Sequence, residues 1–367
     1  MQKNKKNQAD ISKRKARHLD ICVDPKHYQV ESGNTRLDEV HFIHTALPEL
    51  NVDDIDPAMD FCGHRISMPF FISSMTGGAK NAYRANQELA RAAQEEGVGV
   101  GMGSIRILFR HPEYMEQFSL RRLAPDVPIF ANLGAVQIRD MKADSIHEML
   151  KRLEVSALAI HVNPGQELFQ SGGDRDFRGV FEGICRFTEK APVPIIVKET
   201  GFGIHPELAH ELLNSGVDYV NVAGSGGTNW ISVESYREDA QTLAVAEEFR
   251  EWGQPTALLL AALPTQLHPR ILASGGLRSG MDMAKTIAMG AAAAGTALPL
   301  IRAVHKNGRE EVQKLIQGYR RTLISAMALT GSKTLDAFRK GKVWYNSSLS
   351  TDARLLQEKL EKQGSVK

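Results

Sequence analysis

The sequence predicts an α/β protein built on a closed (β/α)8 TIM barrel. From residue 68 onward, short apolar runs of strand length alternate with longer segments whose apolar residues recur every three or four positions. The eight runs lie at residues 69–75, 97–103, 128–134, 157–163, 194–200, 219–225, 270–276 and 291–297. No GxGxxG turn follows the first run, so the pattern favours a closed barrel over an open doubly wound sheet.

The barrel is predicted to occupy residues 66–345, between an N-terminal extension and a C-terminal tail. The extension, residues 1–65, has loop character and turn signals such as Asp24-Pro25. The chain after about residue 308 is predicted to be further helix. It ends in the polar tail, residues 346–367, whose last part, QEKLEKQGSVK (357–367), we expect to be frayed.

The start of the chain is strongly basic. Its first 17 residues contain seven Lys or Arg residues and one acid, Asp10, although the formal charge of the whole chain is only +2. The cluster is either a solvated terminus or a segment that contacts an anion. Because it lacks interleaved aromatic residues, we expect no nucleic-acid partner.

Composition indicates a globular intracellular protein. The chain is 42% apolar and 24% charged, which suffices for a sizeable core. Its three cysteines, Cys22, Cys62 and Cys185, form no CxxC pair, so neither a disulfide framework nor a zinc site is predicted. No window approaches 18 consecutive apolar residues, and we expect a cytoplasmic protein without a membrane partner.

Catalytic groups in this fold come from the C-terminal ends of the strands and the loops that follow them. Six of the predicted strand ends carry polar residues that can handle protons, anions or metals. They are Ser73, Ser74, Met75 and Thr76; Ser104 and Arg106; Asn132; His161, Asn163, Gln166 and Glu167; Lys198 and Glu199; and Thr228 and Asn229.

The last two strand ends predict a phosphate site instead. "SGGLRSG" exposes backbone N–H groups at Gly275 and Gly276 and a cation at Arg278, and an adjacent "GTA" turn comprises Gly295, Thr296 and Ala297. The alternative is that these are only tight strand-to-helix turns.

A third glycine-rich turn, "AGSGGTNW" at residues 223–230, is predicted beside them. Together with Lys198, whose ammonium group could face the N1–C2=O edge of a flavin, these turns suggest a phosphorylated, ring-bearing cofactor such as FMN. The alternative for Lys198 is a structural ion pair with Glu199.

Several motifs, in order along nearly the whole chain, resemble those of type 2 isopentenyl-diphosphate isomerases. They are RKARHL (14–19), DFCGHRISMPFFISSMTGG (60–78), GSIR (103–106), HVNPGQE (161–167), KETGFG (198–203), GSGGTNW (224–230) and SGGLRSG (274–280). The resemblance implies interconversion of isopentenyl and dimethylallyl diphosphate with reduced FMN, Mg²⁺ and NADPH as flavin reductant. It also implies a homo-oligomer, either a tetramer or an octamer.

The resemblance further implies a role for each site residue. Gln166 would be catalytic and Glu167 would hold Mg²⁺. The substrate would be bound by Arg14, Lys15, His18, Arg106, His161, Asn163 and Gln166, the first three in an N-terminal lid. FMN would be bound by Ser73, Ser74, Met75, Thr76, Ser104, Asn132, Lys198, Thr228, Gly275, Gly276, Arg278, Gly295, Thr296 and Ala297.

Two segments depart from the family pattern. Arg17 stands where the family motif RKxEH has Glu, so the partner against which the lid docks is not predicted. Residues 170–174 read QSGGD instead of QPEGD, so the residues around the metal ligand are not predicted either.

Two other functions remain as alternatives. An FMN-dependent 2-hydroxy acid oxidase or dehydrogenase would need a His closely followed by Arg near residues 226–230, where there is no His. The other is a flavin-binding module that has lost catalysis.

Overall fold

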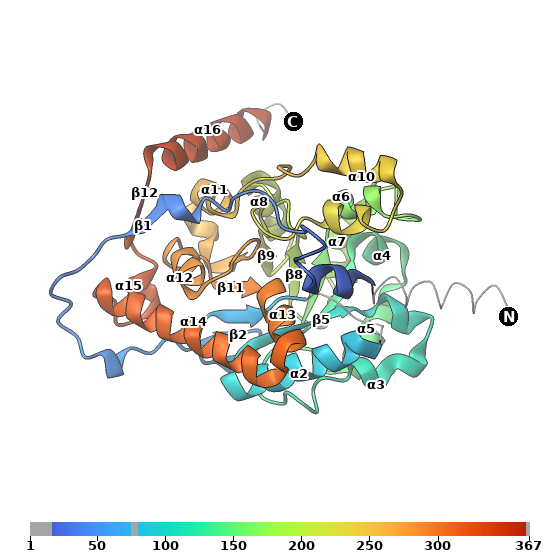
Figure 1. Ribbon diagram of the computed structural model, residues 1–367, viewed down its shortest axis with the longest axis horizontal. Helices are drawn as coiled ribbons and strands as arrows, with labels where there is room; N and C mark the ends of the chain where they lie inside the picture. Colours follow the sequence, from blue (N-terminus) through green and yellow to red (C-terminus); the bar gives the residue numbers. More distant parts are fainter. Residues whose placement is uncertain (1–16, 75–79, 365–367) are drawn as a thin grey trace.

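The computed structural model describes residues 17–74 and 80–364. At its centre, eight parallel strands close into a barrel in the order β10-β11-β4-β5-β6-β7-β8-β9, as predicted (Figure 1). The strands are β4 (Phe70–Ile72), β5 (Gly99–Ser104), β6 (Ile129–Gly134), β7 (Ala157–His161), β8 (Ile195–Lys198), β9 (Tyr219–Asn221), β10 (Ile271–Ala273) and β11 (Ala293–Thr296).

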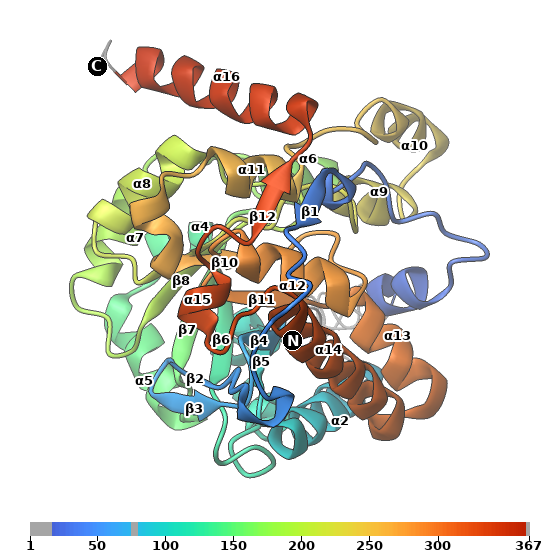
Figure 2. The same cartoon turned by 90° about the vertical axis from the view of Figure 1, so that its left-hand side faces the viewer.

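Helices surround the barrel and occupy the loops between strands (Figures 1 and 2). The α-helices are α2 (Lys80–Glu96), α3 (Met115–Phe118), α4 (Ala135–Asp140), α5 (Ala143–Leu153), α6 (Pro164–Phe169), α7 (Val180–Thr188), α8 (Pro206–Asn214), α9 (Trp230–Ser235), α10 (Ala240–Glu247), α11 (Thr256–Ala262), α12 (Gly280–Ala288), α13 (Leu298–Asn307), α14 (Arg309–Leu329), α15 (Leu335–Phe338) and α16 (Ser347–Gly364). Residues 17–23 are also helical. The 3₁₀ helices are η1 (Leu37–Glu39), η2 (Val52–Asp54), η3 (Ile105–Phe109), η4 (Pro112–Tyr114) and η5 (Thr265–Arg270).

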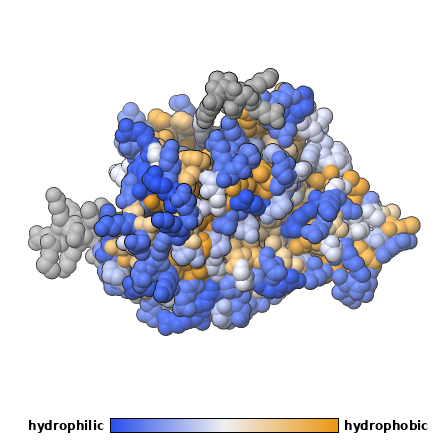
Figure 3. All heavy atoms as spheres, turned by 180° about the vertical axis from the view of Figure 1, so that it is seen from behind, coloured by the Kyte–Doolittle hydropathy of each residue, from blue (hydrophilic) through white to orange (hydrophobic). Residues whose placement is uncertain are grey.

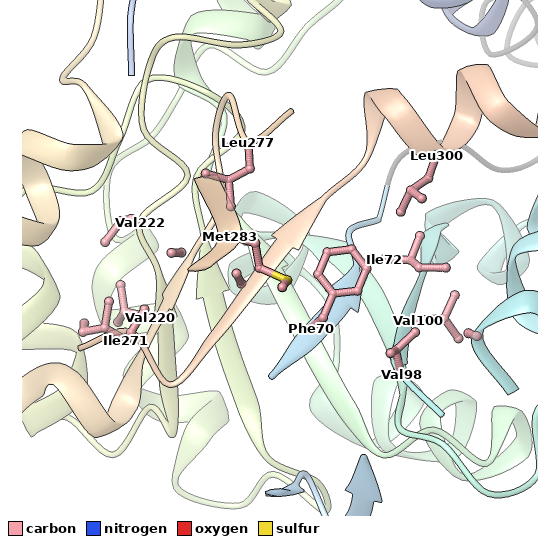
Figure 4. Close-up of a cluster of buried hydrophobic side chains, with 14 of the residues drawn as sticks. Phe70, Ile72, Val98, Val100, Val220, Val222, Ile271, Leu277, Met283 and Leu300 are labelled. Carbon is pink, nitrogen blue, oxygen red and sulfur yellow. The ribbon is translucent and has the colours of Figure 1, made fainter. Parts of the chain in front are cut away.

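Alternation along each strand divides the core into two parts. Phe70 and Ile72 of β4 pack outward against the surrounding helices, where Figure 4 shows them among Val98, Val100 and Leu300. Phe71, between them, points inward and packs against Phe130 with ring centroids 5.9 Å apart. The inner part is a filled barrel core, which holds the strand ends in fixed positions around the mouth.

A hairpin in the N-terminal extension closes the end of the barrel where the strands begin. Strands β2 (Met59–Phe61) and β3 (His64–Ile66) pair across a tight turn at Cys62 and Gly63, both of which have positive φ. Phe61 packs against Phe71, Phe130 and Tyr219 at centroid distances of 6.2, 5.6 and 5.3 Å. Part of the extension is therefore a structural plug rather than a lid.

A segment of the N-terminal extension pairs with a segment near the C-terminus in a small antiparallel sheet. β1 (Val40–Phe42) pairs with β12 (Val343–Tyr345), and the two strands lie side by side in Figures 1 and 2. Helix α16 follows and packs against α11 and α8. The predicted helical character after residue 308 holds, and α16 extends through residue 364, into the segment 357–367 that was expected to be frayed. Leu349 and Ala353, in its first half, are buried against the body. The domain boundaries themselves remain a prediction.

The surface seen in Figure 3 is mainly hydrophilic with smaller apolar areas. The most exposed large apolar side chains on the molecule include Leu47, Trp252, Leu329 and Trp344. Across residues 17–74 and 80–364, no helix has the length and apolar character needed to traverse a bilayer.

Candidate active site

A cavity of about 400 Å³ opens at the C-terminal ends of the barrel strands. Every predicted site residue that the structure describes lines it: His18, Ser73, Ser74, Ser104, Arg106, Asn132, His161, Asn163, Gln166, Glu167, Lys198, Thr228, Gly275, Gly276, Arg278, Gly295, Thr296 and Ala297. The other four, Arg14, Lys15, Met75 and Thr76, lie outside the described residues. The chain thus brings the predicted residues together, while their individual roles remain predictions.

The motif after β7 forms the first turn of α6. Asn163 is its N-cap residue and Pro164 opens the helix, so that residues 163, 166 and 167 share one face. The Asn163 amide donates to Gln166 Oε1 at 2.9 Å and to Glu167 Oε1 at 3.1 Å. Local helix geometry therefore fixes the carbonyl end of Gln166 and one oxygen of Glu167.

The other end of Gln166 contacts a residue that sequence reasoning missed. Its Nε2 donates to Glu234 Oε1 at 2.7 Å, and the Glu234 side chain in α9 is completely buried. His18 Nε2 lies 3.0 Å from the same oxygen, and Arg237 donates to Glu234 Oε2. In the sequence, Glu234 is a single acid after the mainly apolar residues WISV, and this pattern does not indicate which residues it contacts.

Glu234 is held in its charged form. Burial disfavours its ionisation, but the hydrogen bond and charge of His18, the Gln166 amide and the Arg237 cation outweigh burial and lower the pKa of Glu234. A buried anion therefore lies one hydrogen bond from the amide of Gln166.

His18 comes from the helical segment at the start of the described chain. Its ring packs edge-on against Trp230 at 5.6 Å, and both residues line the cavity. The departing residue Arg17 instead donates to the Tyr28 hydroxyl at 2.9 Å. Arg17 is thus used within the N-terminal segment and is absent from the cavity lining among the described residues.

Glu167 is the predicted metal ligand, and its carboxylate is positioned by donors on both oxygens. Besides the Asn163 bond, Glu167 Oε2 accepts from the Asp174 backbone N–H at 2.8 Å and from Gln170 Nε2 at 3.4 Å. Within the described ranges, no three His, Cys, Asp or Glu side chains form a metal-binding group. One carboxylate fits Mg²⁺ that takes its other ligands from water and phosphate.

The departing loop at residues 170–174 packs closely on this carboxylate. A side chain at Gly173 would collide with the Glu167 carbonyl. Asp174 Oδ2 accepts from Gln137 Nε2 at 3.1 Å and lies 3.7 Å from Arg106 Nη1. The loop therefore links the predicted metal ligand to Arg106, which is predicted to bind the substrate.

Two further predicted residues meet at the ends of β6 and β7. His161 Nδ1 and Asn132 Oδ1 are 2.9 Å apart, so the ring nitrogen must donate and the Asn oxygen accept. With Nδ1 engaged in this bond, Nε2 is the other nitrogen of the His161 ring that can take part in hydrogen bonding.

Lys198 forms no ion pair with the Glu199 carboxylate, which was the alternative considered for it. Its Nζ donates to the backbone carbonyl of Glu199 at 2.7 Å. Burial lowers the pKa of Lys198 to about 8, only partly opposed by the Glu199 charge. Glu199 Oε2 instead accepts from the backbone N–H groups of Thr200, Gly201 and Phe202, between 2.5 and 2.6 Å, which shapes the loop after β8.

The glycine-rich turns pack backbone against backbone. Gly275 and Gly276 have φ values of 96° and 73°, and a side chain on either would collide with Gly224 or Gly226 in the neighbouring turn. These glycines are thus required for packing between the turns as well as for any close approach to a ligand.

Three polar atoms at the cavity are suited to binding a polar ligand. Ser73 Oγ, Thr200 Oγ1 and Arg278 Nη2 are buried and have no hydrogen-bond partner within the described part of the chain. Buried polar groups are normally paired, so these atoms fit donors to an anionic or carbonyl-bearing cofactor such as FMN.

Other lining residues were not predicted, including Arg110, His111, Gln137, Gln170 and Trp230. Arg110 and His111 follow η3 and Gln137 lies in α4, beyond the strand ends on which the prediction concentrated. Only the three-dimensional path of these loops brings their side chains to the mouth.

The fold is shared with flavin enzymes of distant sequence. The baker's yeast flavocytochrome b2 flavin-binding domain matches with a TM-score of 0.67 at 17% identity, covering 90% of this chain and 82% of that chain. A mandelate oxidase matches with a TM-score of 0.63 at 17% identity, covering 86% and 94%. At these identities the likeness concerns the fold alone.

Sequence comparison gives a closer kinship. The model of the FMN-dependent dehydrogenase family matches residues 132–345. An isopentenyl-diphosphate delta-isomerase of Borrelia garinii subsp. bavariensis is 42% identical over 349 residues, 95% of this chain and 98% of that protein. One from Methanothermobacter thermautotrophicus is 40% identical over 335 residues, 91% and 93%. The chain therefore belongs to the isopentenyl-diphosphate delta-isomerase family, in its FMN-dependent type 2 form.

Proposed function

We propose that the protein interconverts isopentenyl diphosphate and dimethylallyl diphosphate, with reduced FMN and Mg²⁺ as cofactors. The observation that carries the proposal is the Gln166 amide, which is held between Asn163 and the buried anion Glu234 in the same cavity as the glycine-rich turns and Lys198. The family relatives bear the name of this activity.

The residues on one side of the cavity suit FMN. The turns at Gly275 and Gly295, together with Arg278, would hold the phosphate. Lys198 would place its positive charge at the N1–C2=O edge of the ring, and Ser73 Oγ, which has no partner among the described residues, is a further donor in the same cavity. Bound in its reduced form, FMN would supply a proton donor and acceptor next to the alkene.

The other side of the cavity suits a diphosphate. Arg106 and His161 would contact its oxygens, and Glu167 would hold the Mg²⁺ ion that neutralises their charge. His18 would join them from the N-terminal segment, with Arg14 and Lys15 as further cations of a lid. Although this chain departs from the family pattern at residues 170–174, Asp174 and Gln170 still orient the Glu167 carboxylate.

Moving the double bond requires one proton added at C4 and one removed at C2, through a species with carbocation character. The Glu234 anion, acting through Gln166, would stabilise positive charge beside it. Because Gln166 Nε2 donates to Glu234, its Oε1 is the end whose partial negative charge would face positive charge on the substrate. Gln166 would thus orient the reacting carbons.

Two alternative functions receive less support. A 2-hydroxy acid oxidase shares the barrel and the phosphate turns, but residues 226–230 offer no His as base. A flavin-binding module without catalysis would not need the Asn163–Gln166–Glu234 hydrogen-bond chain. We further propose NADPH as flavin reductant, a cytoplasmic location and a tetrameric or octameric assembly, all from the family resemblance.

The proposal is tested by anaerobic assay of the purified protein with FMN, Mg²⁺ and isopentenyl diphosphate. We expect dimethylallyl diphosphate to form only after the flavin is reduced, by dithionite or NADPH. Bleaching of oxidised flavin by a 2-hydroxy acid, without isomerisation, would favour the oxidase. FMN binding with neither reaction would favour the non-catalytic module.

A further inference from the structure

A segment of the N-terminal extension, residues 30–35, runs along the glycine-rich turn after β9. The Asn229 N–H donates to the Val30 carbonyl at 2.8 Å, and the Ser32 N–H donates to the Gly227 carbonyl at 3.1 Å. Between them, Glu31 and Thr228 form an antiparallel bridge. The extension therefore adds a short strand-like wall to the outside of this turn.

The same segment is packed tightly against both turns. A side chain at Gly226 would collide with the backbone of Thr35, and one at Gly276 would collide with the Thr35 methyl group. The Ala257 N–H donates to the Thr35 carbonyl at 2.9 Å. A shift of this segment would therefore be transmitted to the turns that border the cavity.

Glu31 in this segment binds two arginines from different elements. Its Oε1 accepts from Arg278 Nε at 2.6 Å, and its Oε2 accepts from Arg302 Nη1 at 2.7 Å. Arg302 is itself fixed, because its Nε donates to the Cys22 carbonyl at 3.1 Å. Burial disfavours the Glu31 anion, but the two guanidinium groups outweigh it and lower the pKa of Glu31.

These contacts leave the Arg278 guanidinium with one nitrogen free. Its Nε is occupied by Glu31 and its Nη1 donates to the Leu277 carbonyl at 3.0 Å. Its Nη2 is buried, has no partner among the described residues and belongs to a side chain that lines the cavity. Two fixed nitrogens determine the plane of the group and hence the direction of the third.

We propose that Glu31 is a positioning residue for the cofactor phosphate: it orients Arg278 so that the free Nη2 meets the phosphate of FMN. The inference rests on the proposed function, in which Arg278 binds that phosphate. It assigns a part of the extension outside the lid to cofactor binding. By charge alone, removing the Glu31 anion near a phosphate would strengthen the binding of FMN. The inference predicts the opposite, that removing it weakens the binding of FMN.

The test compares FMN with riboflavin, which lacks the phosphate, by quenching of flavin fluorescence on binding to the apoprotein. Glu31→Gln removes the negative charge and one of the two acceptor oxygens, and Glu31→Asp keeps the charge but shortens the side chain. We expect both to raise the Kd for FMN, roughly tenfold for Glu31→Gln, and to leave the Kd for riboflavin unchanged. Glu39→Gln is the matched control, because Glu39 lies in the same extension and pairs with Arg36 away from the cavity.

Arg278→Met separates the inference from the proposal beneath it. If Arg278→Met leaves the preference for FMN over riboflavin intact, Arg278 does not bind the phosphate and the proposed cofactor site fails. If Arg278→Met lowers the preference but neither Glu31 variant does, or Glu31→Gln tightens FMN binding, the role of Glu31 is overturned. In the Arg278→Met background, Glu31→Gln is expected to have no further effect on FMN. A further effect there would assign Glu31 a general structural role and contradict the inference.

Discussion

The Gln166 side-chain amide donates to the buried Glu234 carboxylate at 2.7 Å, while its carbonyl oxygen accepts from Asn163 at 2.9 Å. These two bonds permit one orientation of the amide, since the reverse orientation would place oxygen against oxygen at Glu234. The cavity therefore presents a fixed amide backed by a buried negative charge.

Replacing Glu234 by Gln removes that charge while keeping a side chain of the same shape. A hydrogen bond to a charged group contributes about 1.5–3 kcal/mol, so kcat is expected to fall roughly 10- to 100-fold. The KM for isopentenyl diphosphate should change less than kcat, because His18 is the one described residue of the proposed diphosphate site that pairs with Glu234. Steady-state kinetics of the reduced enzyme measure both constants.

Glu247→Gln serves as the control for Glu234→Gln, because Glu247 is a more exposed acid in the next helix. FMN content and the thermal unfolding midpoint show whether the Glu234 variant is folded. A folded, FMN-loaded variant with unchanged kcat would contradict the role given to Glu234.

Glu167→Gln is expected to weaken the binding of Mg²⁺ at the proposed site. An amide is a poorer ligand for a hard cation than a carboxylate, so half-maximal activity should require at least about tenfold more Mg²⁺. Titration of activity with Mg²⁺, after treatment with a chelator, gives the value. The exposed Glu148 on α5 offers a control as Glu148→Gln. An unaltered Mg²⁺ titration in Glu167→Gln would remove this residue from the metal site.

Lys198 makes the stability of the apoprotein depend on pH in the alkaline range. Burial lowers its pKa in the folded state from 10.5 to about 8. Between these values the unfolded chain binds more protons, so the contribution of Lys198 to the free energy of unfolding rises with pH. Urea unfolding at pH 8 and pH 10 should show this rise in wild type but a smaller one in Lys198→Met.

Lys190→Met is the control for this comparison, because Lys190 is exposed near the end of α7. Its unfolding free energy should follow the wild-type pH profile. Equal pH profiles for wild type and Lys198→Met would mean that Lys198 is not buried in the way described.

Gly275→Ala is expected to destabilise the protein and to lower its FMN affinity. Its φ of 96° is strained for Ala, and the added methyl group would collide with the Gly224 carbonyl. Gly341→Ala has a similar positive φ, 64°, but nothing within 4 Å of the new methyl group. The second variant measures conformational strain alone, which costs about 1 kcal/mol. Chemical denaturation should therefore show a larger loss for Gly275→Ala, and equal losses would contradict tight packing between the turns.

The barrel was predictable because its period is local: each strand is a short apolar run and each helix repeats every three to four residues. The cavity lining followed from the rule that strand ends meet at one face, which correctly grouped residues as distant as Ser73 and Ala297. The hairpin plug at Phe61 and the packing of α16 against α11 and α8 were not predicted, because they depend on partners far away in the chain.

The same limit explains the missing site residues. Glu234 is recognised as a site residue only through its contacts with His18 and Gln166, which lie 216 and 68 positions away in the sequence. Glu31 likewise pairs with Arg278, 247 positions along the chain. No local sequence pattern indicates that such acids belong to a site, because their partners are brought next to them only by folding.

The central claim is that this cavity isomerises isopentenyl diphosphate without net consumption of electrons. The most direct measurement reduces the FMN-loaded, Mg²⁺-supplemented enzyme once under anaerobic conditions and follows product formation in D₂O. We predict many molecules of dimethylallyl diphosphate per flavin reduced, with deuterium from solvent in the product. Absence of product, or product limited to one molecule per reduced flavin, would contradict the claim.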